Sequence, residues 1–184
     1  MRFPAGPSRA PFETALQKLR DGRPGESGYG HRVAILLTIP AFDDPVARDV
    51  RRAASGEFYV VRTVWQRTLD VPSRRQLPSV DPSLWVLRGA ISERRPSLWS
   101  TTVHVDQVAL RTLLDAIGHA TLPCHPDRGS SATPDATTYE LSFTADINET
   151  RYRWRGDAPA GWQPLATFAT RLAQLVDNPV GATR

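Results

Sequence analysis

The spacing of apolar residues changes along the first part of the chain, and each spacing predicts a different element. In residues 12–20, Phe12, Leu16 and Leu19 fall on one helical face, so we expect a short helix there. Residues 31–39 contain an apolar run without polar alternation. Such a run is typical of a strand that is covered on both faces.

A second helix is expected next, because capping residues follow the first strand. Asp43 or Asp44 suits the N-cap position, and Pro45 suits the first helical turn. The expected buried stripe of this helix consists of Val46, Val50, Ala53 and Ala54. Gly56 is a suitable residue for its end. Residues 58–69 are then rich in β-branched and aromatic side chains, which predicts a strand.

The middle of the chain predicts two further strands and one helix. The strands are expected at residues 84–91 and 98–105, with loops at residues 70–82 and 120–135. Asp106 is a good N-cap residue for the helix that follows. The apolar stripe of this helix is Leu110, Leu113, Leu114 and Ile117, at positions i, i+3, i+4 and i+7.

The last fifty residues carry the clearest alternation. Apolar and polar side chains alternate in residues 139–144 and again in residues 151–155, with a turn at residues 146–148. This pattern predicts a hairpin with one apolar and one polar face. A C-terminal helix is expected to begin at Pro164 and to end at Asn178. Its expected core stripe is Leu165, Phe168, Leu172, Leu175 and Val176.

These elements predict a single-domain α+β fold, with a largely antiparallel sheet and helices packed on one face. Strands and helices are mixed without regular βαβ spacing. The length of 184 residues is typical of a single domain. We expect residues 1–30 to form an N-terminal arm with a short helix. Residues 31–178 form the expected domain, and residues 179–184 a C-terminal tail.

The composition of the chain indicates its cellular compartment, but it does not identify its function. The formal net charge is +4 and the pI is about 9.8, but acidic residues are scattered among the basic ones. Of the 23 basic residues only Lys18 is lysine. The single cysteine excludes an internal disulfide framework. The first residues lack a signal-peptide pattern, and the apolar run at residues 33–39 is too short to span a bilayer. We therefore expect a cytoplasmic protein without a membrane partner.

Residues suited to catalysis or metal binding are few. Cys124 is the only thiol, and the neighbouring His125 is badly placed to activate it in an extended loop. His104 and Asp106 fall on one side of a strand end, and His119 follows a helix later. No spacing typical of a metal site or a phosphate-binding loop is present. We expect no metal and no cofactor. A structural role as polar residues at a strand–helix junction explains His104 and Asp106 equally well.

The most distinctive charged feature is the ladder of Arg151, Arg153 and Arg155. The period of two places three guanidinium groups on one face of a strand. One interpretation is a solvated face that is paired with Glu140 across the hairpin. The others are a surface that binds an acidic protein patch and a surface that binds nucleic acid.

A second candidate surface is Arg62, Trp65 and Arg67. Tryptophan and arginine are common anchors of protein interfaces. Of the five tryptophans, Trp65 is the one least expected to be fully buried, because Gln66 and Arg67 follow it near the end of a strand. For the other tryptophans, core packing is the default expectation.

The C-terminal third resembles small bacterial immunity proteins of polymorphic and contact-dependent toxin systems. The resemblance covers about fifty residues, which form a strand, a turn, a strand and a helix. It includes the segments Tyr139-Glu140-Leu141-Ser142-Phe143, Arg151-Tyr152-Arg153-Trp154 and Pro159-Ala160-Gly161-Trp162-Gln163-Pro164-Leu165. It implies a protein that neutralises a toxin by binding, and it maps no family site residues. Immunity proteins against nucleases are often acidic, whereas this chain is basic, so the resemblance implies a toxin with an acidic or neutral face.

Three functional hypotheses follow from these observations. The leading one is a non-catalytic protein-binding protein that neutralises a cognate toxin by occlusion, with Arg62, Trp65, Arg67, Arg151, Arg153 and Arg155 as its contact residues. The first alternative is a nucleic-acid-associated accessory protein that uses the arginine-rich hairpin. The second is a hydrolase-like enzyme that uses His104, Asp106 and Cys124.

Overall fold

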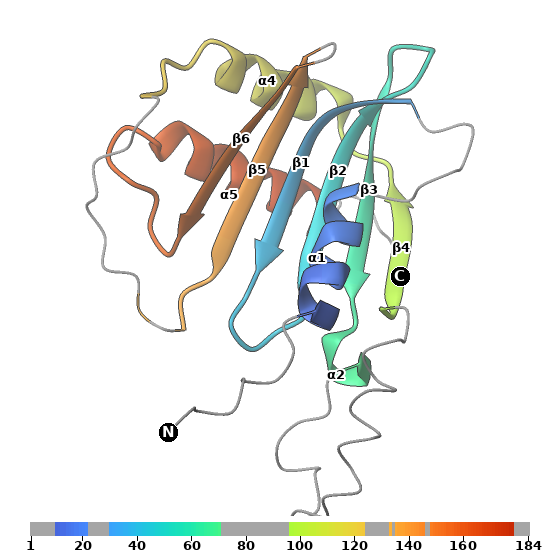
Figure 1. Cartoon of the computed structure of the whole chain (residues 1–184). Coiled ribbons are helices and arrows are strands. Elements are labelled where there is room, and N and C mark those ends of the chain that lie inside the picture. Colours follow the sequence, from blue (N-terminus) through green and yellow to red (C-terminus); the bar gives the residue numbers. More distant parts are fainter. Residues whose placement is uncertain are drawn as a thin grey trace, which may run out of the picture.

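The computed structural model describes residues 10–21, 30–70, 96–123, 133, 135–145 and 148–178. Within them, one antiparallel sheet of six strands has the order β4-β3-β2-β1-β5-β6 (Figure 1). The strands are β1 (His31–Ile39), β2 (Val46–Arg52), β3 (Phe58–Trp65), β4 (Leu98–Val103), β5 (Thr138–Ala145) and β6 (Asn148–Arg155). The helices are α1 (Ala10–Asp21), α2 (Arg67–Asp70), α4 (Gln107–Gly118) and α5 (Gln163–Asp177). This arrangement confirms the predicted α+β class.

The helices cover both faces of the sheet, because the central strand β1 is apolar on both sides. Ala34 and Leu36 of β1 belong to the core beneath α4 and α5. Ile35 and Leu37 belong to a second core beneath α1, on the opposite face (Figure 1). The expectation of helices on one face therefore holds for α4 and α5, whereas α1 packs on the other. The continuous apolar run predicted this double cover of β1.

The helix α1 is attached to the sheet by its apolar stripe. Ala15, Leu16 and Leu19 are almost completely buried, and the ring of Phe12 lies edge-on to Trp65 at 5.4 Å between centroids. Burying a leucine side chain contributes about 1.5–3 kcal/mol. The predicted helix at residues 12–20 is thus confirmed, and its packing positions Arg20, in its last turn, beside the sheet.

The prediction of a helix after Asp43 and Asp44 is wrong. Val46–Arg52 is the strand β2, which pairs with both β1 and β3, and Gly56 lies in the turn to β3 with a φ of 86°. The alternation of β2 was hidden because two of its buried positions, Arg48 and Asp49, are charged. Such residues are almost never buried unless they are paired, and here each forms an ion pair.

The other predicted elements agree with the structure where it describes them. The hairpin is β5 and β6, the strand expected at residues 98–105 is β4, and the two later helices are α4 and α5. The strand expected at residues 58–69 is shorter, since β3 ends at Trp65 and α2 follows. The strand expected at 84–91, the C-terminal tail and much of the N-terminal arm lie outside the described residues.

Candidate functional site

The hairpin of β5 and β6 places its arginines on the sheet face that also carries α1. Across the hairpin, Arg153 lies opposite Glu140 and Arg151 lies opposite Ser142. The alternate positions, including Leu141, pack in the core beneath α4 and α5. The predicted apolar and polar faces of this hairpin are therefore confirmed. The helix α1 lies over β1, β2 and β3, to one side of β5 and β6 (Figure 1). Among the described residues, the side chains of Arg151 and Arg153 on the polar side of this hairpin are about half exposed or more.

The buried carboxylate of Glu140 pairs with two arginines, Arg20 of α1 and Arg153 of β6. Its carboxylate accepts hydrogen bonds from Nε and Nη2 of Arg20 at 2.7 and 2.8 Å, and Nε of Arg153 lies 3.3 Å from Oε1. The Glu140 side chain is only 5% exposed, whereas that of Arg153 is 64% exposed. The interpretation that pairs the ladder with Glu140 across the hairpin therefore holds for Arg153, whose guanidinium group stays at the surface.

The pKa of Glu140 is set by two opposing effects. Burial raises it, but the hydrogen bond from Arg20 and the charges of Arg20, Arg153 and Arg151 lower it, and together they place the pKa below its ordinary value. The carboxylate is therefore the favoured form in the folded protein. A group of this kind stabilises the fold at every pH above its ordinary pKa.

We expect this contribution of Glu140 to disappear in acid. Because the folded pKa is depressed, the stabilisation is complete above about pH 5 and is lost as the pH falls below about 4, through the folded pKa. Urea unfolding of the wild type and of Glu140→Gln should show a difference in unfolding free energy that is constant near neutral pH and shrinks in acid. A difference that does not depend on pH would contradict the ion-pair interpretation.

A second buried carboxylate, Asp49, organises the neighbouring part of the same face. It accepts two hydrogen bonds from Arg32 at 3.0 Å and two from Arg51 at 2.8 and 2.9 Å. Beside the hairpin turn, Nη2 of Arg151 lies 3.1 Å from the Glu149 carboxylate. We call the whole set the arginine face. It consists of Arg20, Arg32, Arg51, Arg151, Arg153 and Arg155.

The arginine face combines rigid carboxylates at its base with guanidinium groups at its surface. Asp49 and Glu140 are 3% and 5% exposed, while the side chains of Arg151 and Arg153 are 51% and 64% exposed. The carboxylates restrict the rotamers of the arginines and therefore lower the entropy that binding would cost. The arrangement is suited to bidentate contacts with carboxylates or phosphates of another molecule.

The second predicted surface does not form. Arg62 lies on the α5 face of the sheet and pairs with Asp177 at 3.0 Å, whereas Trp65 lies on the α1 face. Trp65 is 1% exposed, so the expectation that it is incompletely buried is wrong. Its ring packs against Phe12, and its indole nitrogen donates to Asp70 at 2.6 Å. The helix α2 begins two residues after Trp65, at Arg67. The polar residues that follow Trp65 in the sequence did not indicate that its ring is buried.

The surroundings of Arg67 and Trp99 also differ from those that we expected, which were a binding surface for Arg67 and the core for Trp99. Both Nη atoms of Arg67 donate to the Ala41 carbonyl at 3.2 Å, which ties this side chain to the connection between β1 and β2. Trp99 is 54% exposed, because it lies on the edge strand β4 and α4 and α5 do not cover it. Trp154 and Trp162 are buried as expected, and Trp85 lies outside the described residues.

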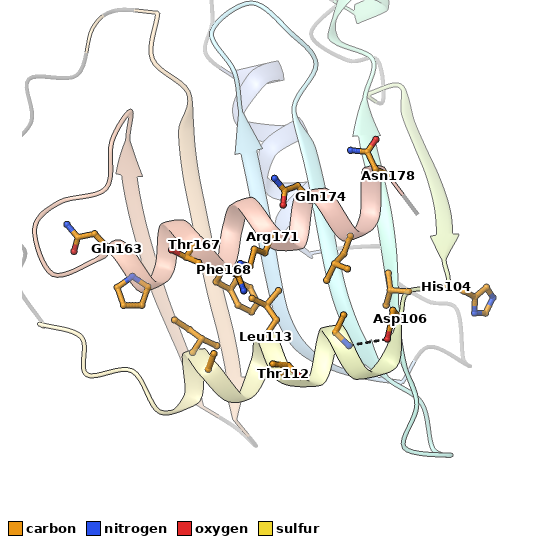
Figure 2. Close-up of a pocket in the computed structure, with 16 residues that line it drawn as sticks. His104, Asp106, Thr112, Leu113, Gln163, Thr167, Phe168, Arg171, Gln174 and Asn178 are labelled. Carbon is orange, nitrogen blue, oxygen red and sulfur yellow. Dashed lines mark hydrogen bonds between the residues drawn. The ribbon is translucent and has the colours of Figure 1, made fainter. Parts of the chain in front are cut away.

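A groove of about 1,370 Å³ runs between α4 and α5 on the opposite side of the sheet. Figure 2 shows the residues that line it, with Phe168 and Leu113 between the two helices. His104 and Asp106 lie at the same end of the groove (Figure 2). The Asp106 carboxylate accepts hydrogen bonds from the Val108 and Ala109 amides at 2.8 and 3.1 Å, so it caps α4 as predicted.

The residues of the hydrolase hypothesis are only partly described. His104 and Asp106 are exposed, and Cys124 lies outside the described residues. Within the part of the chain that the structure describes, no three His, Cys, Asp or Glu side chains are grouped in a way that could hold a metal ion. Across the same residues, no helix is long and apolar enough to cross a membrane.

Sequence reasoning missed the residues that β2, α1 and β1 contribute to the arginine face, which are Asp49, Arg20 and Arg32. Asp49 was assigned to a helix, and Arg20 and Arg32 are far from the hairpin in sequence. The signal for Glu140 was present, since it lies opposite the ladder in the predicted hairpin. Comparisons with protein-family models, with curated proteins and with solved structures found no match to this chain.

Proposed function

We propose that this chain is a non-catalytic protein-binding protein that neutralises a bacterial toxin by occlusion, in the manner of an immunity protein. We propose further that the arginine face contacts the toxin. The observation that carries this proposal is the row of exposed guanidinium groups on β6, above the buried Glu140. Arginine is enriched in protein interfaces, and arginines held in place before binding lose less entropy when they bind.

The mixture of charges favours a protein partner over nucleic acid. Among its guanidinium groups the arginine face also presents the half-exposed carboxylate of Glu149. A phosphate backbone is uniformly negative and would be repelled by this group, whereas a protein surface can match both signs. The resemblance of the C-terminal third to immunity proteins supports the same reading. The partner expected is a toxin with an acidic or neutral face.

The test is to express the products of the neighbouring genes with and without this chain. We expect one product that stops growth when it is expressed alone and permits growth when this chain is present. The two proteins should purify as an equimolar complex after nuclease treatment. The proposal is contradicted if no neighbouring product binds. Retention of nucleic acid without nuclease, with an affinity that falls steeply with salt, would favour the nucleic-acid alternative.

A substitution in the residues of the hydrolase hypothesis separates catalysis from occlusion. We expect the double variant Cys124→Ala, His104→Ala to protect cells from the toxin as well as the wild type does, because a binding protein needs neither a thiol nor an imidazole for chemistry. Growth curves of cells that express the toxin with each variant would measure this. Loss of protection with an intact complex would show that these side chains act chemically.

A further inference from the structure

The strand β6 is the last strand at one side of the sheet, beside β5 (Figure 1). Its eight residues pair with β5 in an unbroken register, from Asn148 opposite Ala145 to Arg155 opposite Thr138. Among the described residues, no strand pairs with its other side. An edge strand of this kind presents backbone N–H and C=O groups with which another chain can pair. The outer edge of β6 is therefore a candidate binding site.

The hydrogen-bond register shows which residues of β6 point their backbone groups outward. Just beyond the two strands, the Gly156 amide donates to the Thr137 carbonyl at 2.8 Å. Hydrogen-bonded and non-hydrogen-bonded pairs alternate in an antiparallel ladder. Every second residue of β6, counted back from Gly156, therefore also bonds to β5. Arg153 and Arg151 lie between these residues, so their backbone N–H and C=O groups face away from β5.

The side chains of the same two arginines carry exposed charge along this edge. They are 51% exposed in Arg151 and 64% exposed in Arg153. Arg151 donates to the Ser142 hydroxyl at 3.3 Å and to the Glu149 carboxylate at 3.1 Å, and Arg153 pairs with Glu140. Side chains two residues apart on one strand face are separated by about 6.6 Å. The edge thus presents two oriented guanidinium groups at this interval, beside the outward backbone groups.

The charge of the edge favours an acidic strand over a second copy of this chain. In the two registers that overlap two β6 strands most, Arg151 lies opposite Arg151 or Arg153 of the second copy. Like charges directly opposite each other destabilise a strand pair. Carboxylates at alternate positions of another segment would reverse the sign of both contacts. Opposite side chains have Cβ atoms about 4.5–5.5 Å apart, which suits a guanidinium–carboxylate pair.

We propose that β6 binds an extended acidic segment of a partner protein, which adds to the sheet as a further antiparallel strand. The segment would pair with the outward backbone groups of Arg151 and Arg153, and two of its carboxylates would lie opposite their guanidinium groups. Because Glu149 follows on the same face, the third alternate position of the segment is neutral or basic. This inference rests on the proposed function for the toxin as the source of the segment, and it specifies how the toxin would be bound.

The test is a nuclear magnetic resonance titration of the ¹⁵N-labelled full chain with a blocked synthetic peptide. Its central residues are glutamate, valine, glutamate, valine and lysine, flanked by threonines. The antiparallel register places the glutamates opposite Arg153 and Arg151 and the lysine opposite Glu149. We expect saturable shifts of these amides with a dissociation constant of about 1 mM or tighter. No saturable shift at millimolar peptide concentrations overturns the proposal.

Amide hydrogen exchange distinguishes strand addition from contact through side chains. In the unbound chain, the amides of Arg151 and Arg153 should exchange faster than that of Tyr152, because only Tyr152 bonds to β5. Saturating peptide should slow the two arginine amides roughly tenfold or more. Slow exchange of all three amides in the unbound monomer would show that the edge is already occupied, and it would overturn the proposal. Protection that appears only as a dimer forms would assign the edge to a second copy instead.

Matched peptides and variants assign the contacts. A peptide with N-methyl groups on its two glutamates keeps every charge but loses two backbone donors, so it should bind about tenfold more weakly or worse. Equal affinity for this peptide would overturn strand addition. The peptide of reversed order should also bind more weakly, because its lysine would lie opposite an arginine. Arg153→Gln should weaken the binding several-fold, whereas Arg171→Gln, on α5, should bind as the wild type does.

This experiment fails separately from the test of the proposed function. The titration uses the chain alone and does not depend on a toxin. Binding of the peptide without any toxic neighbouring product would reject the toxin and retain the acidic strand. Protection from a toxin, with unchanged exchange of the Arg151 and Arg153 amides in the complex, would reject strand addition and retain the toxin.

Discussion

A chain that carries Arg151→Gln and Arg153→Gln is expected to bind the toxin partner that we propose about a hundredfold more weakly than the wild type. Such a loss corresponds to about 2.7 kcal/mol, which is typical when exposed arginine anchors at the centre of an interface are removed. Glutamine keeps a similar length and an amide donor, so the change removes mainly the charge and the bidentate contact. Calorimetric titration of the purified pair would measure the effect.

The matched control removes the same charge from the other side of the molecule. Arg111→Gln with Arg171→Gln lowers the formal net charge from +4 to +2, as the first double variant does. Both of these arginines belong to the helices that cover the opposite face of the sheet. We expect the control to bind within about threefold of the wild type. An equal loss in both double variants would mean that overall charge, rather than contact, governs binding.

Glu140→Ala is expected to lower the unfolding free energy by about 3 kcal/mol. Breaking a buried ion pair by removing one partner costs about 3–5 kcal/mol, and the lower end applies because Arg20 and Arg153 retain some contact with water. The loss of local stability should be largest in α1, because Arg20 links the end of this helix to β5. Urea unfolding would measure the stability, and amide hydrogen exchange would locate the loosened helix.

The control for this substitution is Glu149→Ala. Glu149 also pairs with an arginine of the hairpin, Arg151, but its side chain is 46% exposed. Exposed ion pairs contribute about 0–1 kcal/mol, so the control should unfold nearly as the wild type does. Similar losses in the two variants would contradict the view that burial makes Glu140 the organising residue of the arginine face.

Alternating or periodic apolar residues made most of the fold predictable. The C-terminal hairpin, α4 and α5 are all marked by apolar stripes of the right period, and each is confirmed. Local signals also located the Asp106 cap of α4. In these elements the side chains that face the core are apolar, so the pattern in the sequence and the burial in the structure coincide.

The failures share one physical cause, which is that contacts distant in sequence determine burial. Arg48 and Asp49 are buried in β2 because Asp177 and Arg32 neutralise them, and no local pattern contains these partners. Trp65 is buried because α1 covers it. The arginine face was predictable only where it lies within one hairpin. The contribution of Arg20 depends on where α1 docks, which the sequence does not indicate.

The most direct test of the central claim is to locate the toxin on the chain by amide hydrogen exchange of the purified complex. If the arginine face contacts the toxin, binding slows exchange in β6 and in the adjoining part of β5, beside Arg151 and Arg153. The residues that line the groove between α4 and α5 should exchange as they do in the free chain. Protection confined to that groove, with β6 unchanged, would contradict the arginine face as the binding surface.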